Sequence, residues 1–309
     1  MLTVIVGVGS ALLFGFADFF GGLAAKRMSA IRVTAIAAVT GLAALCVALP
    51  VLGGVWSWQA VLFGGLSGVA GAIAIVLLYA CLAIGPMSIL SPLTAVVSAI
   101  VPVIVGVARG DRLTGLGYAA LGIALIAVVL VALVKEERAA RPSVRALLMA
   151  VGSGTMIGLF LILIDLTPDD SGLVPLIANR AVNGTLMFVV IGVLAVWASR
   201  RGARVAGVVL PGGQAVATDA ATTPIGLLSP GWRAGLSLAL VCGVIDAVAN
   251  SLLLWGLRIG DLSVMAVLSA LYPAGTIILA ALVLRERITL VQGLGLVLAL
   301  AAAGMLALA

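Results

Sequence analysis

The amino-acid sequence predicts an all-α integral membrane protein, with ten transmembrane helices arranged as two inverted five-helix repeats. Three observations predict this fold class: the composition, the length of the apolar runs and a similarity between the two halves of the chain. Hydrophobic residues make up 64% of the sequence and charged residues only 9%. A soluble domain carries about 25% charged residues, so we expect the surface of this protein to face lipid.

The apolar runs are unbroken and long enough to cross a bilayer as helices. A helix rises about 1.5 Å per residue, so roughly twenty residues cross about 30 Å of hydrocarbon. A membrane β-barrel would instead show segments of about ten residues that alternate between apolar and polar positions. We therefore predict ten helical spans, at residues 2–25, 31–53, 59–84, 86–108, 114–134, 144–166, 172–198, 232–257, 261–284 and 289–308.

The two halves of the chain resemble each other at polar as well as apolar positions. The sequence LAIGPMS at residues 82–88 matches LRIGDLS at residues 257–263, and the match extends without a gap to Asp111 and its counterpart Glu286. Each half contains an odd number of predicted spans, so consecutive copies enter the membrane from opposite sides. Inverted repeats of this kind are common in secondary transporters.

The repeat also predicts the domain organisation. A charged segment, KEERAARPS, lies at the midpoint of the chain, and a Gly-, Pro- and Thr-rich segment interrupts the second half. We divide the chain into a first repeat at 1–134, a charged linker at 135–143 and a second repeat at 144–309 that contains the long loop 199–231.

The basic residues predict an orientation in the membrane. Thirteen of the 17 Lys and Arg residues lie in or beside the odd-numbered connections between spans, and the other four lie near the even-numbered ones. Because cytoplasmic connections carry the excess of Lys and Arg, we expect both chain ends on the outside. This distribution accounts for the net charge of +6 without a nucleic-acid partner.

Several sequence features together are typical of one transporter family. They are the segment GFADFFGGLAAKR at residues 15–27, the helix-end triplets at 110–112 and 285–287, and a proline within the fourth span of each half, Pro102 and Pro273. In these features the chain resembles the ten-helix EamA branch of the drug/metabolite transporter superfamily, over nearly its whole length. The resemblance implies a solute carrier with a central cavity between the repeats.

Asp18 is the one acidic residue of the first predicted span, and it lies eight residues before Lys26, well inside the hydrocarbon. An ionised carboxylate in hydrocarbon costs several kcal/mol unless it is paired, hydrated or neutralised. One interpretation is a carboxylate that lines the cavity and binds a cationic group or a proton. The other is a hydrogen-bonded Asp18 that only orders the neighbouring helices. With no histidine in the chain, proton coupling would need a carboxylate, and Asp18 and Asp246 are the deep ones.

The eighth span carries Asp246 and, four residues later on the same helix face, Asn250. Such a pair can line a solute cavity, or it can hold helices together through hydrogen bonds. Arg180 lies near the start of the seventh span, where we expect its side chain to extend toward the lipid headgroups. Pairing with an anionic substrate is the alternative for Arg180.

Two tyrosines and three prolines complete the candidate site residues. Tyr79 and Tyr272 lie within spans, where a phenol either hydrogen-bonds a solute or simply packs. Pro92, Pro102 and Pro273 each remove an intrahelical hydrogen bond, which can kink a helix and serve gating, or can only shape the packing.

The sequence also argues against several function classes. The absence of histidine excludes Ser-His-Asp and Cys-His catalytic sites and most zinc sites. No G-x-x-x-x-G-K-[ST] motif for nucleotide-driven transport is present. We therefore expect no enzyme activity, no cofactor and no metal.

From these features we expect a secondary transporter in the cell (plasma) membrane that exports a small metabolite or drug-like solute by alternating access, with optional proton coupling. An uncoupled exchanger or facilitator is the alternative, followed by an intramembrane lipid-modifying enzyme. The expected partners are a small-molecule solute and the lipid bilayer, with a homodimer left open.

Overall fold

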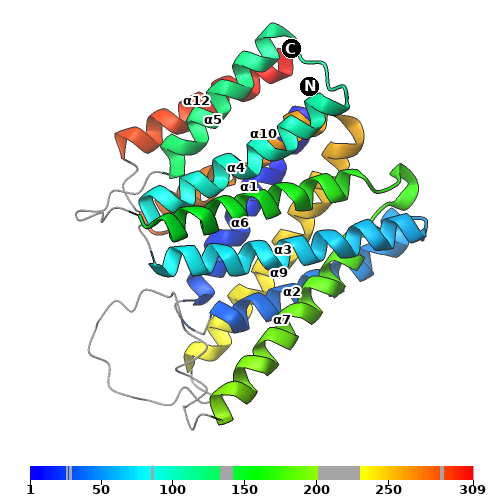
Figure 1. Ribbon diagram of the computed structural model, residues 1–309, viewed down its shortest axis with the longest axis vertical. Helices are drawn as coiled ribbons and strands as arrows, with labels where there is room; N and C mark the ends of the chain where they lie inside the picture. The colour runs from blue at the N-terminus through cyan, green and yellow to red at the C-terminus, as the bar shows by residue number, and fades with distance from the viewer. Residues whose placement is uncertain are drawn as a thin grey trace.

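Apolar helices account for all regular secondary structure in the described part of the chain (Figure 1). The computed structural model describes residues 1–25, 27, 30–84, 87–132, 142–200, 230–285 and 289–308, so most of the predicted 135–143 linker and 199–231 loop lies outside the described residues. The helices are α1 Leu2–Ala25, α2 Ala30–Leu52, α3 Trp58–Ile84, α4 Met87–Arg109, α5 Gly115–Ala132, α6 Val144–Asp165, the 3-10 turn η1 Asp169–Ser171, α7 Val174–Arg200, α9 Pro230–Ile259, α10 Leu262–Ser269, α11 Tyr272–Val283 and α12 Leu290–Leu308.

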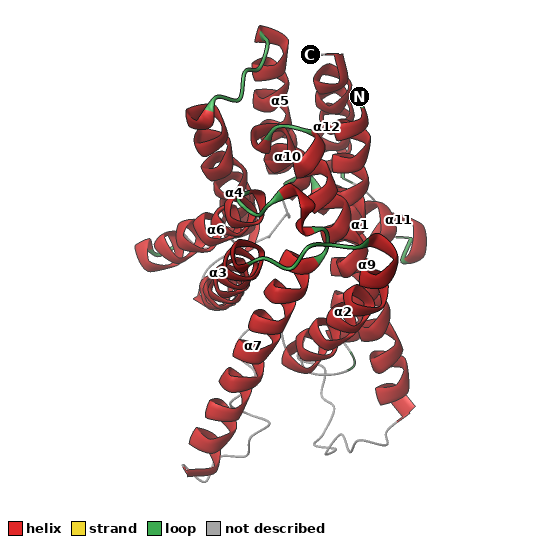
Figure 2. Ribbon diagram, turned by 90° about the vertical axis from the view of Figure 1, so that its right-hand side faces the viewer, coloured by secondary structure: helices red, strands yellow, loops and turns green. Residues whose placement is uncertain are grey.

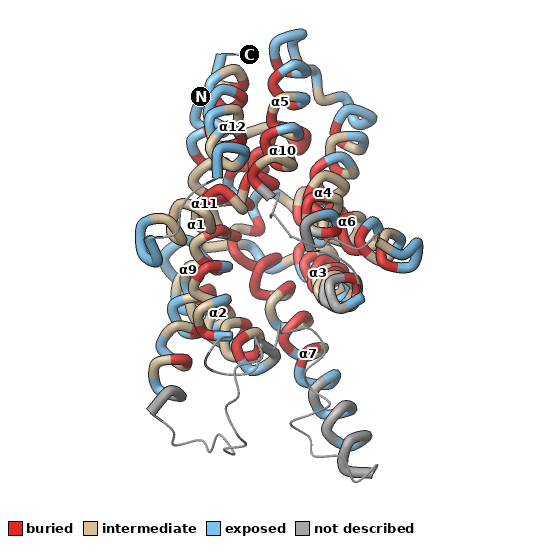
Figure 3. The backbone as a smooth tube through the Cα atoms, turned by 90° about the vertical axis from the view of Figure 1, so that its left-hand side faces the viewer, coloured by how far each residue is buried: buried red, intermediate tan, exposed pale blue. Residues whose placement is uncertain are grey.

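The outer surface of the molecule is apolar. Among the described residues, eight helical stretches are long and apolar enough to cross a membrane, and Gly115–Val131 and Val174–Val190 are apolar but shorter. Large apolar side chains point outward, with Leu290 94% exposed and Val51 85% exposed. Figure 3 shows the buried positions where helices face one another and the exposed ones on outer faces. The predicted all-helical membrane fold is therefore confirmed in its general class.

Helix ends follow local sequence signals. Gly53 adopts a φ of 73°, and its N–H donates to the carbonyl of Leu49 at 2.7 Å. A residue without Cβ takes this left-handed conformation readily, so α2 ends at Leu52. At the start of α6, the Ser143 side chain accepts a hydrogen bond from the N–H of Ala146 at 3.2 Å, which caps the helix.

Helices from the two halves interlace. Helices α3, α4 and α6 form one group, and α1, α9 and α11 form a second group, with α7 and α2 beside them and α10 packed between α4 and α1 (Figure 2). Each group takes two elements from one half and one from the other. Helix α2 packs on α9 and α7 packs on α3, while α5 packs against α12 at one end. The space between the two groups is therefore lined by both halves of the chain.

The predicted span 261–284 is divided into α10 and α11. The helix stops at Ser269, turns through Ala270 and Leu271, and restarts with Pro273 in the first turn of α11. A proline lacks an N–H and its ring clashes with the carbonyl four residues earlier, whereas the first helical turn tolerates it. Helix α4, by contrast, remains one helix across Pro92 and Pro102.

Helices α1 and α11 cross with their backbones in contact. A Cβ added to Gly15 would lie 2.6 Å from the backbone nitrogen of Thr276, and one added to Gly275 would lie 2.5 Å from the carbonyl oxygen of Leu12. The Thr276 hydroxyl donates to the Gly15 carbonyl at 3.1 Å. This crossing holds the break between α10 and α11 against the middle of α1.

Candidate functional site

A cavity of about 190 Å³ lies between the two helix groups. Its polar wall comes from α7 and α9, and its apolar wall comes from α1, α3 and α6. Because these helices belong to both halves of the chain, the cavity lies at the interface between them. The lining residues are Phe14, Gly71, Ala74, Ile75, Leu78, Ile157, Phe160, Asn179, Arg180, Asn183, Asp246 and Asn250.

An ion pair between Arg180 of α7 and Asp246 of α9 forms the polar wall of this cavity. Nη2 of Arg180 donates to Oδ2 of Asp246, and the two side chains are 18% and 23% exposed. The expectation that Arg180 extends toward the headgroups is therefore wrong. In hydrocarbon an unpaired guanidinium and an unpaired carboxylate are both costly, and pairing across two helices offsets part of both costs.

Asn250 supports the ion pair from the same helix as Asp246. Its Nδ2 donates to the Asp246 backbone carbonyl at 2.8 Å and to Oδ1 at 3.3 Å. The spacing of four residues brings the two side chains to one helix face. Asn250 is 3% exposed, so it holds the Asp246 carboxylate in place from the buried side of α9.

Two asparagines of α7, one on each side of Arg180 in the sequence, join this helix to α3. Asn179 Nδ2 donates to the hydroxyl of Ser67 at 2.7 Å, and Asn183 Nδ2 donates to the Gly68 carbonyl at 3.4 Å. Both contacts tie α7 to α3 on either side of Arg180. The sequence patterns did not single out Asn183 or the inward direction of Arg180, although the spacing of Asn179 and Asn183 is the same as that of Asp246 and Asn250.

Asp18 lies on α1 one helical turn beyond Phe14, which lines the cavity. The side chain is exposed, and it forms no hydrogen bond or ion pair with any described residue. It lies close enough to Asp246 for the two charges to interact, and the thiol of Cys242 is within electrostatic range of both carboxylates. The carboxylates of α1 and α9 therefore lie near each other, and that of Asp246 lines the cavity.

The remaining predicted site residues lie in different places. Tyr272 is in the first turn of α11, within electrostatic range of Asp18 but outside the cavity lining. Tyr79 belongs to α3, and its side chain lies outside the described residues. The three prolines belong to α4 and α11, and none of them lines the cavity.

Polar contacts join the helix ends at the face that carries both chain ends. Arg109 pairs with Asp165 at 3.0 Å, and Asp111 Oδ2 accepts from the N–H and hydroxyl of Ser263 at 3.0 and 2.7 Å. These contacts connect the end of α4 with α6 and α10. They therefore join the first half of the chain to the second.

Arg258 makes the densest set of contacts at this face. Its guanidinium donates to the Thr167 carbonyl and hydroxyl, both at 2.5 Å, to Asp169 at 3.3 Å and to Ser171 at 3.4 Å. Four acceptors of the α6–α7 turn are thereby fixed to the end of α9.

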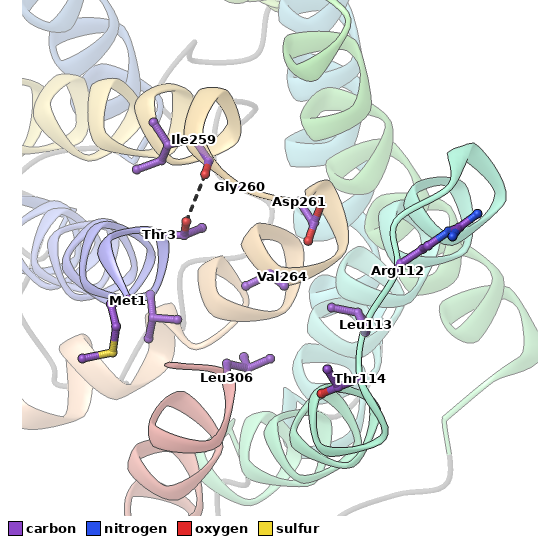
Figure 4. Close-up of a pocket in the computed structure, with 11 residues that line it drawn as sticks. Met1, Thr3, Arg112, Leu113, Thr114, Ile259, Gly260, Asp261, Val264 and Leu306 are labelled. Carbon is purple, nitrogen blue, oxygen red and sulfur yellow. Dashed lines mark hydrogen bonds between the residues drawn. The ribbon is translucent and has the colours of Figure 1, made fainter. Parts of the chain in front are cut away.

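A second cavity of about 300 Å³ opens at the same face. It lies among the start of α1, the start of α10 and the α4–α5 connection, where Thr3 donates to the Ile259 carbonyl at 3.2 Å (Figure 4). Asp261 lies on its rim. Partial burial raises the pKa of this carboxyl, and the nearby Asp111 charge raises it further.

The comparison with family models identifies the class of protein. The model of the EamA-like transporter family matches residues 144–308, which is more than half of the chain. The chain belongs to the EamA-like transporter family. It is therefore a multi-pass membrane protein of the drug/metabolite transporter type, as its sequence resemblance implied, and members of this family are transporters rather than enzymes.

Solved structures support the fold alone. One crystal structure, titled only "Crystal structure of protein", aligns with a TM-score of 0.64 at 15% sequence identity, covering 99% of this chain and 96% of the other. A search of the curated proteins found no match.

Proposed function

We propose that this EamA-like protein is a secondary transporter that moves a small solute through the Arg180–Asp246 cavity by alternating access. The observation that carries this proposal is an ion pair that lines a cavity within the membrane-spanning helices. Charged residues inside membrane proteins mark substrate and ion pathways, because a purely structural role rarely offsets their desolvation. The cavity's place between elements of both halves also fits a transporter built from repeats.

We also propose that the two halves are inverted five-helix repeats. Exchanging the halves maps α1 onto α6, α3 onto α9, and α4 onto the α10–α11 pair. Under this exchange the packing of α1 on α9 becomes the packing of α6 on α3, and the packing of α2 on α9 becomes that of α7 on α3. Both pairs of contacts exist, which supports pseudo-twofold symmetry about the cavity.

Alternating access requires the cavity to open first to one face and then to the other. The contacts of Arg109, Asp111 and Arg258 bind the helix ends together at the face of the chain ends. From the distribution of basic residues, we propose that this face lies outside a plasma membrane and that the solute is exported. Opening toward the outside would then break the Arg109–Asp165 and Asp111–Ser263 contacts, which connect the two halves.

Proton coupling through Asp18 is part of the proposal. Asp246 forms an ion pair with Arg180, whereas Asp18 has no ion-pair partner among the described residues. A carboxylate that lies beside the cavity without a counter-ion can exchange a proton as access alternates. This observation favours a proton-coupled transporter over an uncoupled exchanger.

The test starts from the solute. Untargeted metabolite comparison of cells with and without the protein supplies candidates, and uptake of each is then measured in liposomes that contain the purified protein. Asn250→Leu should lower transport at least tenfold while the protein stays folded in detergent, because the Asp246 carboxylate loses its support. Ser237→Ala, on the same helix but outside the cavity, is the matched control. Normal transport by Asn250→Leu would remove this cavity from the solute path.

A further inference from the structure

Asp111 is held in a fixed position by the way α4 ends. Gly110 adopts a φ of 110°, and its N–H donates to the Val107 carbonyl at 3.1 Å. The N–H of Asp111 donates to the Gly106 carbonyl at 3.0 Å. These two hydrogen bonds form a Schellman motif, which commonly ends a helix at a glycine of positive φ. The backbone of Asp111 is therefore part of the helix end, and its side chain is left to reach another helix.

The helix that Asp111 reaches is α10, which comes from the other half of the chain. Oδ2 of Asp111 accepts from the N–H of Ser263 at 3.0 Å and from its hydroxyl at 2.7 Å. Ser263 is 0% exposed, and a Cβ added to Gly106 would collide with Asp111 Oδ2 and Ser263 Oγ. A glycine at position 106 therefore leaves the room that this contact needs.

The donor that Asp111 uses is one that a residue of α10 itself would normally serve. The first N–H groups of a helix lack intrahelical acceptors, and the N-cap side chain usually accepts from the second or third of them. Asp261 is the N-cap residue of α10, with a φ of −72° and a ψ of 142°, yet its side chain forms no cap hydrogen bond. Ser263 is the second residue of this helix, so Asp111 occupies a donor that Asp261 could use.

The two carboxylates exclude each other from this donor. The charge of Asp111 lies close enough to act on Asp261, and two like charges beside one N–H repel each other. The Asp261 side chain is exposed, and it forms no hydrogen bond or ion pair with any described residue (Figure 4). Asp261 can therefore turn toward Ser263 once Asp111 has left.

Helix α10 is tied to the second helix group at both of its ends. A short connection joins it to α9, and Ala270 and Leu271 join it to α11, which crosses α1 in backbone contact. Met265 also fills space beside Gly7 of α1 and Gly256 of α9, where an added Cβ would lie 3.2 and 2.6 Å from its sulfur. Helix α4 has no covalent link to α10. When the face of the chain ends opens, we therefore expect α4 to separate from α10.

We infer that Asp111 and Asp261 exchange as the cap of α10 when this face opens. With the face closed, Asp111 caps α10 from the end of α4. With the face open, Asp261 caps α10 from its own N-cap position. Cap exchange rests on the proposed alternating access and deepens it, because it names the contact that regulates opening. Asp111 is then a positioning residue that holds α10 against α4, and its release costs less because the N–H of Ser263 regains an acceptor.

The test measures the separation of α4 and α9 at this face, in the purified full-length protein in lipid nanodiscs. Spin labels are attached at Val107→Cys and Ile259→Cys, both exposed positions, after the three native cysteines are replaced by alanine. Double electron–electron resonance gives the populations of short and long distances. Asp111→Ala should raise the ratio of long to short distances about fivefold, and Asp261→Ala should lower it about fivefold, as expected for the loss of one cap.

Conservative variants separate capping from other effects. Asparagine caps a helix about as well as aspartate, so Asp261→Asn should keep the ratio within about twofold of the wild type, unlike Asp261→Ala. Asp170→Asn, in the exposed η1 turn, is the control with no expected change. A merely structural role for Asp111 would lower the melting temperature of Asp111→Ala without changing the ratio of distances.

The outcomes distinguish cap exchange from the proposed function. Shifts of the ratio in the same direction for Asp111→Ala and Asp261→Ala, or no shift in either, would overturn cap exchange. A long-distance population in the wild type would still support alternating access in that case. Absence of any long distance, in the wild type and in every variant, would contradict alternating access and cap exchange together.

Discussion

Two arginines on neighbouring transmembrane helices differ in what surrounds them. Arg258, at the end of α9, reaches four acceptors in the α6–α7 turn, and it lines neither of the two cavities described above. Arg180, within α7, reaches only Asp246 among the described residues and lines a cavity. The number of fixed acceptors around a cation, rather than its mere presence in a membrane helix, therefore separates a structural arginine from one available to a ligand.

The largest expected effect follows from removing the cation that lines the cavity, Arg180. Arg180→Met leaves Asp246 without a counter-ion, so we expect a loss of about 3 kcal/mol of stability and no measurable transport. The double variant Arg180→Met with Asp246→Leu should regain most of the stability but none of the transport. Unfolding in detergent and flux in liposomes provide the two readouts. Wild-type flux in the double variant would show that the pair is structural.

A second test concerns the unpaired carboxylate. Asp18→Asn should abolish transport driven by a pH gradient while the protein folds normally, since the amide cannot carry a proton. Exchange of solute without a gradient should survive if Asp18 only carries the proton, and fall if Asp18 also binds a cationic solute. Asp170→Asn, in the exposed η1 turn, is the matched control. Undiminished gradient-driven transport in Asp18→Asn, at equal protein levels, would remove Asp18 from the mechanism.

Arg258 should respond in the opposite way to Arg180. Arg258→Met leaves acceptors of Thr167 and Ser171 without their donor, at a cost of about 2 kcal/mol. The concentration of solute that half-saturates transport should stay the same, because this arginine does not line the cavity. A large change in that concentration, with unfolding unaffected, would contradict the contrast between the two arginines.

The smallest expected effect concerns Asp261 at the rim of the second cavity. Its raised pKa means that the folded protein holds the proton more tightly than the unfolded chain. The stabilisation is therefore present below the unfolded pKa, near 3.9, and is lost as the pH rises through the folded value. Asp261→Asn should stabilise the protein at pH 7 by less than about 0.5 kcal/mol, and not at pH 3. Thermal unfolding at the two pH values measures the difference.

The sequence predicted the parts of this structure that depend on composition and helix periodicity. Long apolar runs predicted the helices, and the four-residue spacing of Asp246 and Asn250 predicted their shared face. The direction of Arg180 could not be predicted in the same way, because its partner lies 66 residues away on another helix. The break at Ala270 and Leu271 could not be predicted from Pro273 either. A proline within a span does not by itself predict a break, because Pro92 and Pro102 lie within a helix that does not break.

The crossing at Gly15 and Gly275 has a mechanical consequence. With backbone against backbone and no side chain between them, α1 and α11 cannot slide past each other without a collision. We therefore expect the two helices to move together whenever α11 moves relative to the rest of the protein. Asp18 lies less than one turn from the crossing and would move with them, whereas Arg180 belongs to α7, outside this pair.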